Sequence, residues 1–468
     1  MKVPVWLLET LLLLCLLAVV FPLAMGLRTG QFREPDTREN LLIALNLLRY
    51  KVYSMQEARD GNPPRPTTKR EPLYPTLLGF WMAALRDEKS FADPPTLGSL
   101  DPGFALRLKS LNVLLHLCLI LASWWAARAF FRRPWPALAV AVLVAFNSSM
   151  LSTIDVFLTE IPAALLLATS SALICLTYTR KSVGYAILGG VSLGALALTR
   201  AVYFYFLILV AVGAAVWLAA VEIRKHRRQR PLAARWVAMA LVALAVYSPW
   251  FVRNQRLGEA LQVDKRGEDV LAIRAEYSTM SWRQYAASFF YFTPTIGPRL
   301  ATALFGEQTI QSFDRDNPQS FFRKALAGTG EVQRTASTRH LSTRQASIRV
   351  MVEHLPMMTL LTLPFAYQGA FVQVGYNVRR VPGILLYLTL VYSIFFVPAL
   401  AILTIRLARR RDPRWPFLAP ALYSYVFYSL ITHYIPRYSV PLVPIFLIAL
   451  VSVIGLKHEA DRTDTVSE

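Results

Sequence analysis

The chain has 468 residues, of which 55% are hydrophobic, and its 50 Lys and Arg against 29 Asp and Glu give a formal net charge of +21. Apolar runs near the ~20 residues that a helix needs to cross a bilayer recur along it, which excludes a soluble globular protein and indicates a polytopic membrane protein. In a soluble chain the charge would suggest nucleic acid. Here much of it falls in short segments between apolar runs, so membrane topology explains it and no nucleic acid partner is expected.

The first apolar run, 5–27, is interpreted as a membrane span. It follows a single Lys2, exceeds a usual signal-peptide core in length and lacks a clear small-residue cleavage site. The cysteines Cys15, Cys118 and Cys175 all lie in apolar runs without CxxC or His–Cys spacing. This setting favours packing roles over a disulfide or a metal site.

The apolar runs together predict an all-α polytopic membrane protein with about 10 transmembrane helices, within a range of 10–12. The predicted spans are 5–27, 107–127, 135–151, 157–179, 184–199, 201–221, 236–252, 382–405, 416–432 and 438–456. An even number of spans places both termini on the same side of the membrane.

Basic clusters indicate which side that is. The clusters all fall on one face of this threading, at 126–134, 180–181, 222–235 and 406–414. The positive-inside rule assigns this face to the cytoplasm, so two large loops lie outside and are expected to carry interfacial helices. The expected parts are an N-terminal transmembrane catalytic module 1–252 with the first external loop 28–106, a second external loop 253–381, C-terminal helices 382–456, and a cytoplasmic tail 457–468.

Two further apolar stretches are not counted as spans. The stretch 355–374 carries two prolines and Gln368, and a crossing there would move the cluster 406–414 to the wrong face, so an interfacial or re-entrant segment is favoured over an eleventh span. The run 75–85 is too short to cross and is expected to lie flat at the outer interface, with Trp81 at headgroup depth.

Acidic residues lie near the outer ends of these spans, where a charge is costly and suggests function. Asp36 follows the first span and precedes apolar residues at helical spacing, so it is either the cap of an amphipathic helix or a functional carboxylate. Asp155 and Glu160 flank the start of the 157–179 span, but their spacing does not stack them on one helix. Asp155 is an N-cap or a site acid, and Glu160 is a cap or a carboxylate facing a cavity.

Cationic residues converge on the same face. Arg200, Arg253 and Arg437 each lie at the outer end of a predicted span, and each taken alone would be a snorkelling anchor. The positive-inside rule depletes short outer loops of arginine, so the shared placement of these three arginines on the outer face suggests a function. Together with Lys69 and Arg70 of KREPLYPTLLGF they are expected to bind a phosphate at the membrane surface.

The segments around these residues contain five motifs: D-x-x-x-N from Asp36, REPLYP from Arg70, TE-x-P from Thr159, PW-x-x-RN-x-x-x-G from Pro249 and RYSVPLVP from Arg437. Their order resembles the GT-C superfamily of membrane glycosyltransferases. More narrowly, it is similar to bacterial relatives of protein O-mannosyltransferases and lipid A aminoarabinose transferases, which use polyprenyl-phosphate sugars. The resemblance covers about 1–261 and 382–456.

This resemblance implies an inverting, outward-facing transferase with catalytic carboxylates in the first external loop. Asp36 matches the family's early acidic position, although relatives often have an acid beside it where this chain has Thr37. Because a positioned carboxylate can accept the proton of an attacking sugar hydroxyl, Asp36 is expected to be the base. Glu160 matches the acid before a later helix, and Asp155 is the remaining catalytic candidate.

The other expected site residues bind the two substrates. The residues expected to stabilise the leaving phosphate are Lys69, Arg70, Arg200, Arg253 and Arg437. The residues expected to bind substrate are Glu71, Tyr74, His433 and Tyr434. No cofactor is required by this interpretation; a divalent metal is compatible with it but is not indicated, and DRD at 314–316 is interpreted as surface charge.

The expected partners are a polyprenyl-phosphate-linked sugar, a glycan, lipid or protein acceptor, and membrane lipids. The expected location is a bacterial inner (plasma) membrane, with the active site facing the periplasm or the cell exterior. Two alternatives stay open: a transporter or flippase of lipid-linked sugars, and a polymerase or ligase that uses a diphosphate-linked glycan.

Overall fold

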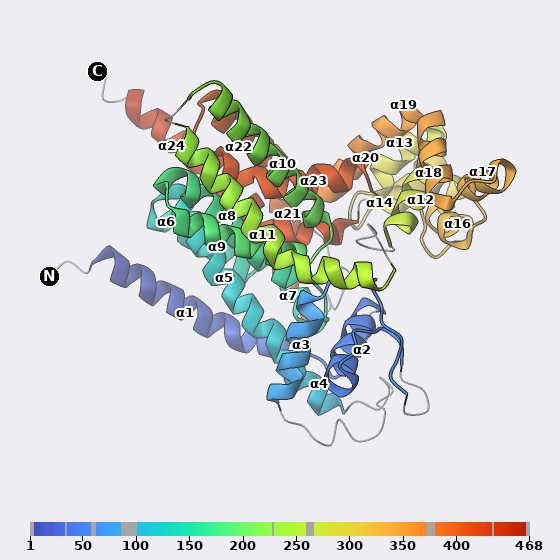
Figure 1. Cartoon of the computed structure of the whole chain (residues 1–468), viewed down its shortest axis with the longest axis horizontal. Helices are drawn as coiled ribbons and strands as arrows, with labels where there is room; N and C mark the ends of the chain where they lie inside the picture. The colour runs from blue at the N-terminus through green and yellow to red at the C-terminus, as the bar shows by residue number, and fades with distance from the viewer. Residues whose placement is uncertain are drawn as a thin grey trace. The chain divides into compact units, whose positions relative to one another are not determined.

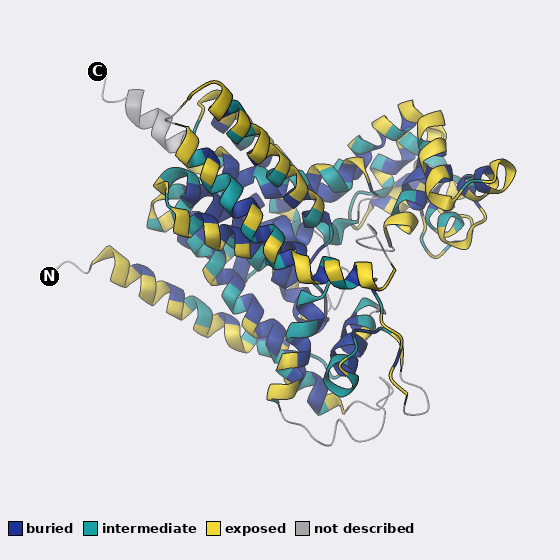
Figure 2. Cartoon of the chain, viewed as in Figure 1, coloured by how far each residue is buried: buried dark blue, intermediate teal, exposed yellow. Residues whose placement is uncertain are grey.

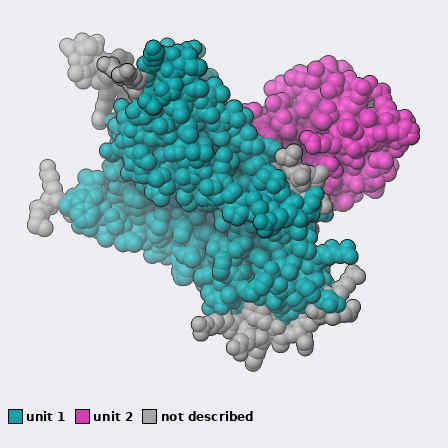
Figure 3. Space-filling model, in the orientation of Figure 1, with its two compact units in different colours: residues 1–263, 374–421, 440–468 teal, residues 264–373, 422–439 magenta. Residues whose placement is uncertain are grey.

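The computed structural model describes residues 4–32, 35–57, 62–85, 101–226, 229–258, 266–371, 380–432 and 435–464. The chain divides into two compact units, drawn in teal and magenta in Figure 3. Unit 1 comprises 1–263, 374–421 and 440–468, and unit 2 comprises 264–373 and 422–439.

Within the described residues, 6 helices are long and apolar enough to cross a membrane, or up to 8 if each of two pairs bent by 41° is one span (Figure 1). The single ones are α1 (Val5–Gly26), α4 with α5 (Pro102–Leu108 and Ser110–Phe131), α8 (Glu160–Arg180), α10 (Val202–Ile223), α11 (Arg230–Arg256), and η6 with α24 (Pro436–Leu442 and Val443–Asp464). The bent pairs are α6 with α7 and η3 (Pro134–Ala145, Ser148–Ser152 and Thr153–Asp155), and α21 with α22 (Gly383–Ser393 and Phe396–Arg409).

Each predicted span overlaps a helix of the structure. Two of them are short: 184–199 corresponds to α9 (Val183–Ala197, 15 residues), and 416–432 corresponds to η5 (Trp415–Leu418) with α23 (Ala419–Leu430, 12 residues). The prediction of an all-α protein with several apolar helices is confirmed for the part of the chain that the structure describes.

Burial separates helices that face lipid from helices that fill the interior of unit 1. The apolar window of α1 is 22% buried and that of α8 is 72% buried. Figure 2 shows exposed positions along much of α1, while the buried ones, Glu9, Leu13, Val20 and Ala24, are few. A helix that is apolar all round and mostly exposed is expected only where the surrounding solvent is hydrocarbon.

Two of the predicted basic clusters meet at one end of unit 1. The Arg414 guanidinium donates to the Phe130 carbonyl at 3.2 Å, lies 5.1 Å from the Phe130 ring centroid, and pairs with Asp412 at 2.6 Å. The cluster 406–414 therefore lies beside the C-terminal end of α5, as the ten-span threading predicts. This end of unit 1 is called the basic end below.

The two stretches excluded from the spans form short helices. The stretch 355–374 contains α19 (Leu355–Leu360) and α20 (Thr362–Ala370), and neither is long enough to cross a bilayer. The run 75–85 lies in α3 (Leu73–Ala84), which packs on α2 (Pro35–Tyr50).

Unit 2 is a cluster of short helices around α12 (Arg266–Ser278). Its core is formed by Ala272, Ala275, Val332, Ala336, Ala346 and Val350. Besides α19, α20 and most of α23, its other described helices are α13 (Trp282–Tyr291), α14 (Gly297–Phe305), α15 (Glu307–Gln311), α16 (Phe321–Ala327), α17 (Glu331–Arg339) and α18 (Thr343–Glu353).

Candidate active site

Most of the predicted site residues lie at one end of unit 1, where helix ends meet the first loop. This end, called the Asp36 end, contains the C-terminal ends of α1, α9 and α11 and the N-terminal ends of α5, α8 and α10. The segments 35–57 and 62–73 contact these helix ends.

Asp36 belongs to a cluster of three charged side chains. It lies in the first turn of α2, and Glu39 follows it one turn later on the same helix face. Arg70 bridges the two carboxylates: its Nη2 lies 2.5 Å from Asp36 Oδ1, its Nε donates to Glu39 Oε2 at 2.6 Å, and Nη2 also contacts Glu39 Oε2. Glu39 is therefore a second carboxylate beside Asp36, although Thr37 occupies the adjacent position in the sequence.

The open cluster, as we call Asp36, Glu39 and Arg70, is partly accessible. The exposed fractions of these side chains are 19%, 29% and 9%, respectively. Burial alone would lower the pKa of Arg70, but Asp36 and Glu39 outweigh burial and raise this pKa above its ordinary value. Two carboxylates share one guanidinium here, and each keeps part of its surface accessible.

Glu71 connects the first loop to the start of α10. Its carboxylate accepts a hydrogen bond at 2.9 Å from the backbone N–H of Ala201, the residue that precedes α10. The backbone pairs there as well, because the Leu73 N–H donates to the Leu198 carbonyl at 3.0 Å. An anionic side chain at a helix N-terminus is favourable, so Glu71 holds the loop against α10. The structure thus gives Glu71 a contact distinct from a salt bridge to Arg70.

Glu160 and Arg200 form a buried ion pair. Arg200 Nη2 lies 2.9 Å from Glu160 Oε1, and both side chains are buried. Glu160 is the first residue of α8, where the helix dipole favours a carboxylate. The pair joins α8 to the α9–α10 turn. Tyr74 lies in the same buried region and donates its hydroxyl proton to Asn112 Oδ1 at 2.7 Å.

Arg253 stacks on aromatic rings next to the first loop. Its guanidinium carbon lies 4.7 Å from the Trp250 ring centroid and 5.1 Å from that of Tyr53, and Nη2 donates to the Tyr53 carbonyl at 3.4 Å. The Tyr53 hydroxyl in turn donates to the carbonyls of Arg70 and Glu71, both at 3.0 Å. Tyr53 therefore connects Arg253 to the segment that carries Arg70.

Tyr53 is also an electrostatic link between these groups. Burial raises the pKa of its phenol well above the ordinary value, and nearby Glu71 raises it further, while Arg253 and Arg70 oppose both effects. Tyr53 is therefore a neutral hydrogen-bond donor at physiological pH.

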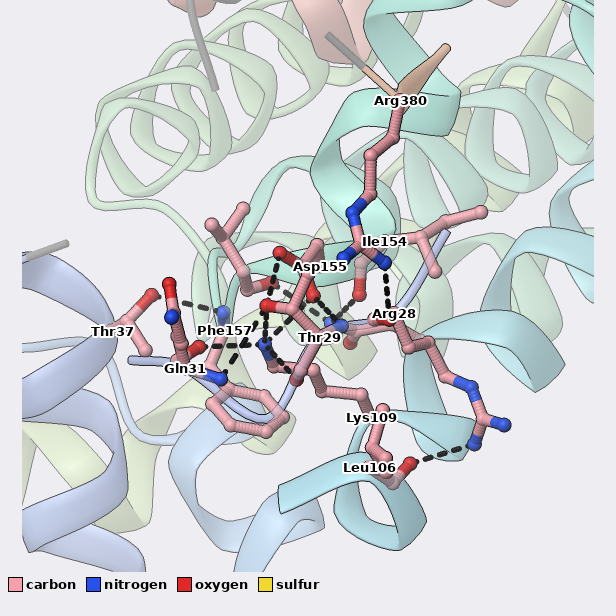
Figure 4. Close-up of polar contacts among 12 residues, drawn as sticks. Arg28, Thr29, Gln31, Thr37, Leu106, Lys109, Ile154, Asp155, Phe157 and Arg380 are labelled. Atoms are coloured by element: carbon pink, nitrogen blue, oxygen red, sulfur yellow. Dashed lines mark hydrogen bonds and ion pairs between the residues drawn. The ribbon is translucent and has the colours of Figure 1, made fainter. Parts of the chain in front are cut away.

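Asp155 lies in a second, fully enclosed cluster (Figure 4). Its Oδ1 accepts from the Thr29 N–H at 2.5 Å and from Lys109 Nζ at 2.7 Å, and its Oδ2 accepts from the Thr29 hydroxyl at 2.8 Å. The exposed fractions are 0% for the Lys109 side chain and 4% for Asp155. Helix α8 starts at Glu160 after Thr159, so Asp155 does not cap it. We call Lys109 and Asp155 the closed cluster.

The remaining predicted site residues are Lys69, Arg437, His433 and Tyr434. Lys69 is exposed, and Arg437 lies in the part of η6 that belongs to unit 2, with its guanidinium carbon 6.0 Å from the Tyr438 ring centroid. His433 and Tyr434 lie outside the described residues. Among the residues that were described, no group of three or more His, Cys, Asp or Glu side chains is placed to hold a metal ion.

Sequence reasoning missed Glu39, Lys109 and Tyr53. Glu39 stands three residues after Asp36 at the start of a helical pattern, and that spacing alone predicts a shared face. Lys109 lies inside the predicted span 107–127, where a charge by default indicates a partner. No local pattern distinguishes Tyr53 from the chain's other tyrosines.

No model of a known protein family matches the chain, and no curated protein matches it. Among solved structures, the chain is similar to the archaeal oligosaccharyltransferase AglB from Archaeoglobus fulgidus in complex with an inhibitory peptide and a dolichol-phosphate. The identity is 12% and the TM-score 0.48, over 97% of this chain and 52% of that one, so this chain spans about half the length of that protein.

The chain is also similar to ArnT from Cupriavidus metallidurans. With undecaprenyl phosphate bound, the identity is 14% and the TM-score 0.38, over 94% of this chain and 77% of ArnT. In the apo state, the identity is 15% and the TM-score 0.39 over the same shares.

Proposed function

We propose that this chain is an inverting membrane glycosyltransferase that moves a hexosyl or pentosyl group from a polyprenyl-phosphate carrier to an acceptor hydroxyl. The observation that carries the proposal is the open cluster. It presents a partly accessible carboxylate pair at helix ends of a membrane protein, and Tyr53 links it to Arg253. The order of motifs in the sequence supports the same assignment.

In the proposed reaction Asp36 is the general base. It accepts the proton of the acceptor hydroxyl while the hydroxyl oxygen forms a bond to the anomeric carbon. The bond from that carbon to the phosphate oxygen breaks, and the polyprenyl phosphate leaves with the bonding electron pair. Because attack and departure occur on opposite faces of the sugar, the configuration inverts. Arg70 bridges Asp36 and Glu39 and thereby orients both carboxylates.

Fixed cations would stabilise the phosphate as its negative charge grows. Arg253 is a candidate because Tyr53 links it to the segment that carries Arg70, and Lys69 is a candidate because it is exposed on the segment that leads to Arg70. Arg70 and Arg200 already pair with carboxylates and would act through the local field. Arg437 stays a phosphate-binding prediction that rests on its motif RYSVPLVP.

The proposed location is a bacterial plasma membrane, with the Asp36 end facing the periplasm or the exterior. The basic end of unit 1 would then face the cytoplasm, as the positive-inside rule requires. The acceptor class is a hydroxyl-bearing glycan, lipid or protein. No metal step is needed, because a carboxylate base and cationic side chains supply both proton transfer and charge stabilisation.

The test is turnover of a panel of polyprenyl-phosphate sugars by the full-length protein in detergent, measured as released polyprenyl phosphate with and without candidate acceptors. Asp36→Asn should lower turnover by about 10²–10⁴-fold, because the base is removed while the side chain keeps its size. The matched control is Glu57→Gln, which changes an exposed carboxylate that pairs with Arg38 at 2.7 Å. Binding of the donors without release of lipid phosphate would instead indicate a carrier.

A further inference from the structure

The backbone of Phe157 holds α2 through two residues that follow Asp36. The Phe157 N–H donates to the Thr37 hydroxyl at 3.0 Å, and the Asn40 amide donates to the Phe157 carbonyl at 2.7 Å. Thr37 and Asn40 are each 1% exposed, so these bonds form away from water. Thr37 adjoins Asp36, and Asn40 adjoins Glu39, so one peptide backbone fixes the helix that presents both carboxylates.

The segment that carries Phe157 is itself anchored from two sides. The Asn112 amide donates to the carbonyls of Ile154 and Val156 at 3.1 and 2.8 Å. Between these two carbonyls, the Asp155 side chain is held by Thr29 and Lys109 (Figure 4). The segment 153–157 is thereby fixed to the N-terminal end of α5 and to the residues that follow α1.

Lys109 is a buried cation that pairs with Asp155 of this segment. Besides Asp155, its ammonium lies 2.8 Å from the Thr29 carbonyl oxygen, 3.3 Å from the Thr29 hydroxyl and 2.7 Å from the Gln31 carbonyl oxygen. A buried ammonium surrounded by oxygens at these distances satisfies its donors and neutralises Asp155 without an added ion.

We propose that Asp155 and Lys109 are positioning residues for the proposed transfer reaction: they fix the 153–157 segment, whose Phe157 backbone holds Asp36 in its reactive position through Thr37 and Asn40. This inference rests on the proposed function for its catalytic consequence. Asp155 is enclosed and both of its oxygens accept hydrogen bonds, so it acts through α2 and not on a substrate. A displacement of about 1 Å at a reacting group can cost about 10²-fold in rate.

The first test is Thr37→Val, which removes the acceptor of the Phe157 N–H and keeps the side-chain shape. We expect kcat to fall by about tenfold with the donor KM near that of the wild type, because geometry and not binding is changed. The melting temperature should fall as well, because the buried Phe157 N–H loses its acceptor. Thr37→Ser, which restores the hydroxyl, should recover most of kcat. The matched control is Thr177→Val, at a buried threonine near the other end of α8, which should leave kcat unchanged.

The second test does not depend on activity. The double variant Lys109→Met/Asp155→Leu removes the anchor and leaves no uncompensated charge. We expect backbone amides of α2 to exchange hydrogen about tenfold faster than in the wild type, while α9 exchanges at an unchanged rate. Unchanged exchange in α2 would overturn the anchoring, and wild-type kcat in Thr37→Val would overturn the positioning of Asp36. If the wild type turns over no donor, the proposed function fails and the exchange measurement alone decides the anchoring.

Discussion

The open and closed clusters are built from similar ions and lie in the same unit, yet they differ in solvent access and in charge balance. The closed cluster pairs one ammonium with one carboxylate inside the protein, and the surrounding oxygens complete its hydrogen bonds. The open cluster sets two carboxylates against one guanidinium at a partly exposed position. In the closed cluster both Asp155 oxygens accept hydrogen bonds from the protein, whereas the carboxylates of the open cluster stay partly exposed.

The difference follows from the elements that carry the ions. Lys109 lies at the α4–α5 junction, and Asp155 lies in η3. Other helices pack against both elements. Asp36 and Glu39 lie on α2, an amphipathic helix, and Arg70 lies on the segment leading to α3. An ion that is enclosed must be fully paired, while an ion at the edge of the fold can keep unused hydrogen-bonding capacity for a ligand.

The largest effect should come from breaking the closed cluster. Lys109→Met should lower the free energy of unfolding by about 3–5 kcal/mol, because it leaves the Asp155 carboxylate buried without its counterion. The double variant Lys109→Met/Asp155→Leu should recover most of this loss, since no charge then remains buried. Denaturant or thermal unfolding in detergent measures both.

The control for that experiment is Arg38→Met, which breaks the exposed pair between Arg38 and Glu57. Its effect should stay below about 1 kcal/mol, as for most surface pairs. If Lys109→Met is no more destabilising than Arg38→Met, the two clusters do not differ in the way that their burial indicates.

A smaller effect, on rate more than on stability, should follow Arg70→Lys. A guanidinium can reach Asp36 and Glu39 together, but the single ammonium of lysine cannot reproduce this forked geometry. We expect kcat to fall by about tenfold, with the unfolding free energy changed by about 1 kcal/mol or less.

The matched control for Arg70→Lys is Arg38→Lys. Arg38 lies on α2 and forms an exposed ion pair with Glu57, so this variant should leave kcat unaltered. An Arg70→Lys variant with normal kcat would show that the fork does not orient Asp36, and the open cluster would then need no arginine geometry at all.

The sequence predicted the apolar helices and several of the charged positions, because hydropathy and span ends are local properties. It placed Asp36, Glu160 and Arg200 near helix ends, but it did not predict their partners. Glu160 meets Arg200 across 40 positions, and Lys109 meets Asp155 across 46. Such pairing depends on how helix ends pack, and no short window of sequence contains both members.

The different partners of the predicted arginines could not be predicted from the sequence either. Arg70, Arg200 and Arg253 look alike in the sequence as outer cations. In the structure Arg70 bridges two carboxylates, Arg200 pairs with Glu160, and Arg253 stacks on rings. The partners distinguish these arginines, and Asp36, Glu160 and Tyr53 come from segments distant in the sequence.

The smallest effect is expected at Lys69, the exposed cation nearest in sequence to the open cluster. Lys69→Gln should raise the donor KM by about two- to threefold at low salt and leave kcat unchanged, because an exposed ammonium attracts the lipid phosphate at long range without touching the reacting atoms. This difference should disappear as ionic strength rises and the Debye length shortens. The control is Lys181→Gln, an exposed lysine after the C-terminal end of α8, at the end of that helix opposite Glu160. An equal KM change in both variants would mean that net charge and not position sets donor attraction. A fall in kcat for Lys69→Gln alone would instead make Lys69 part of the open cluster.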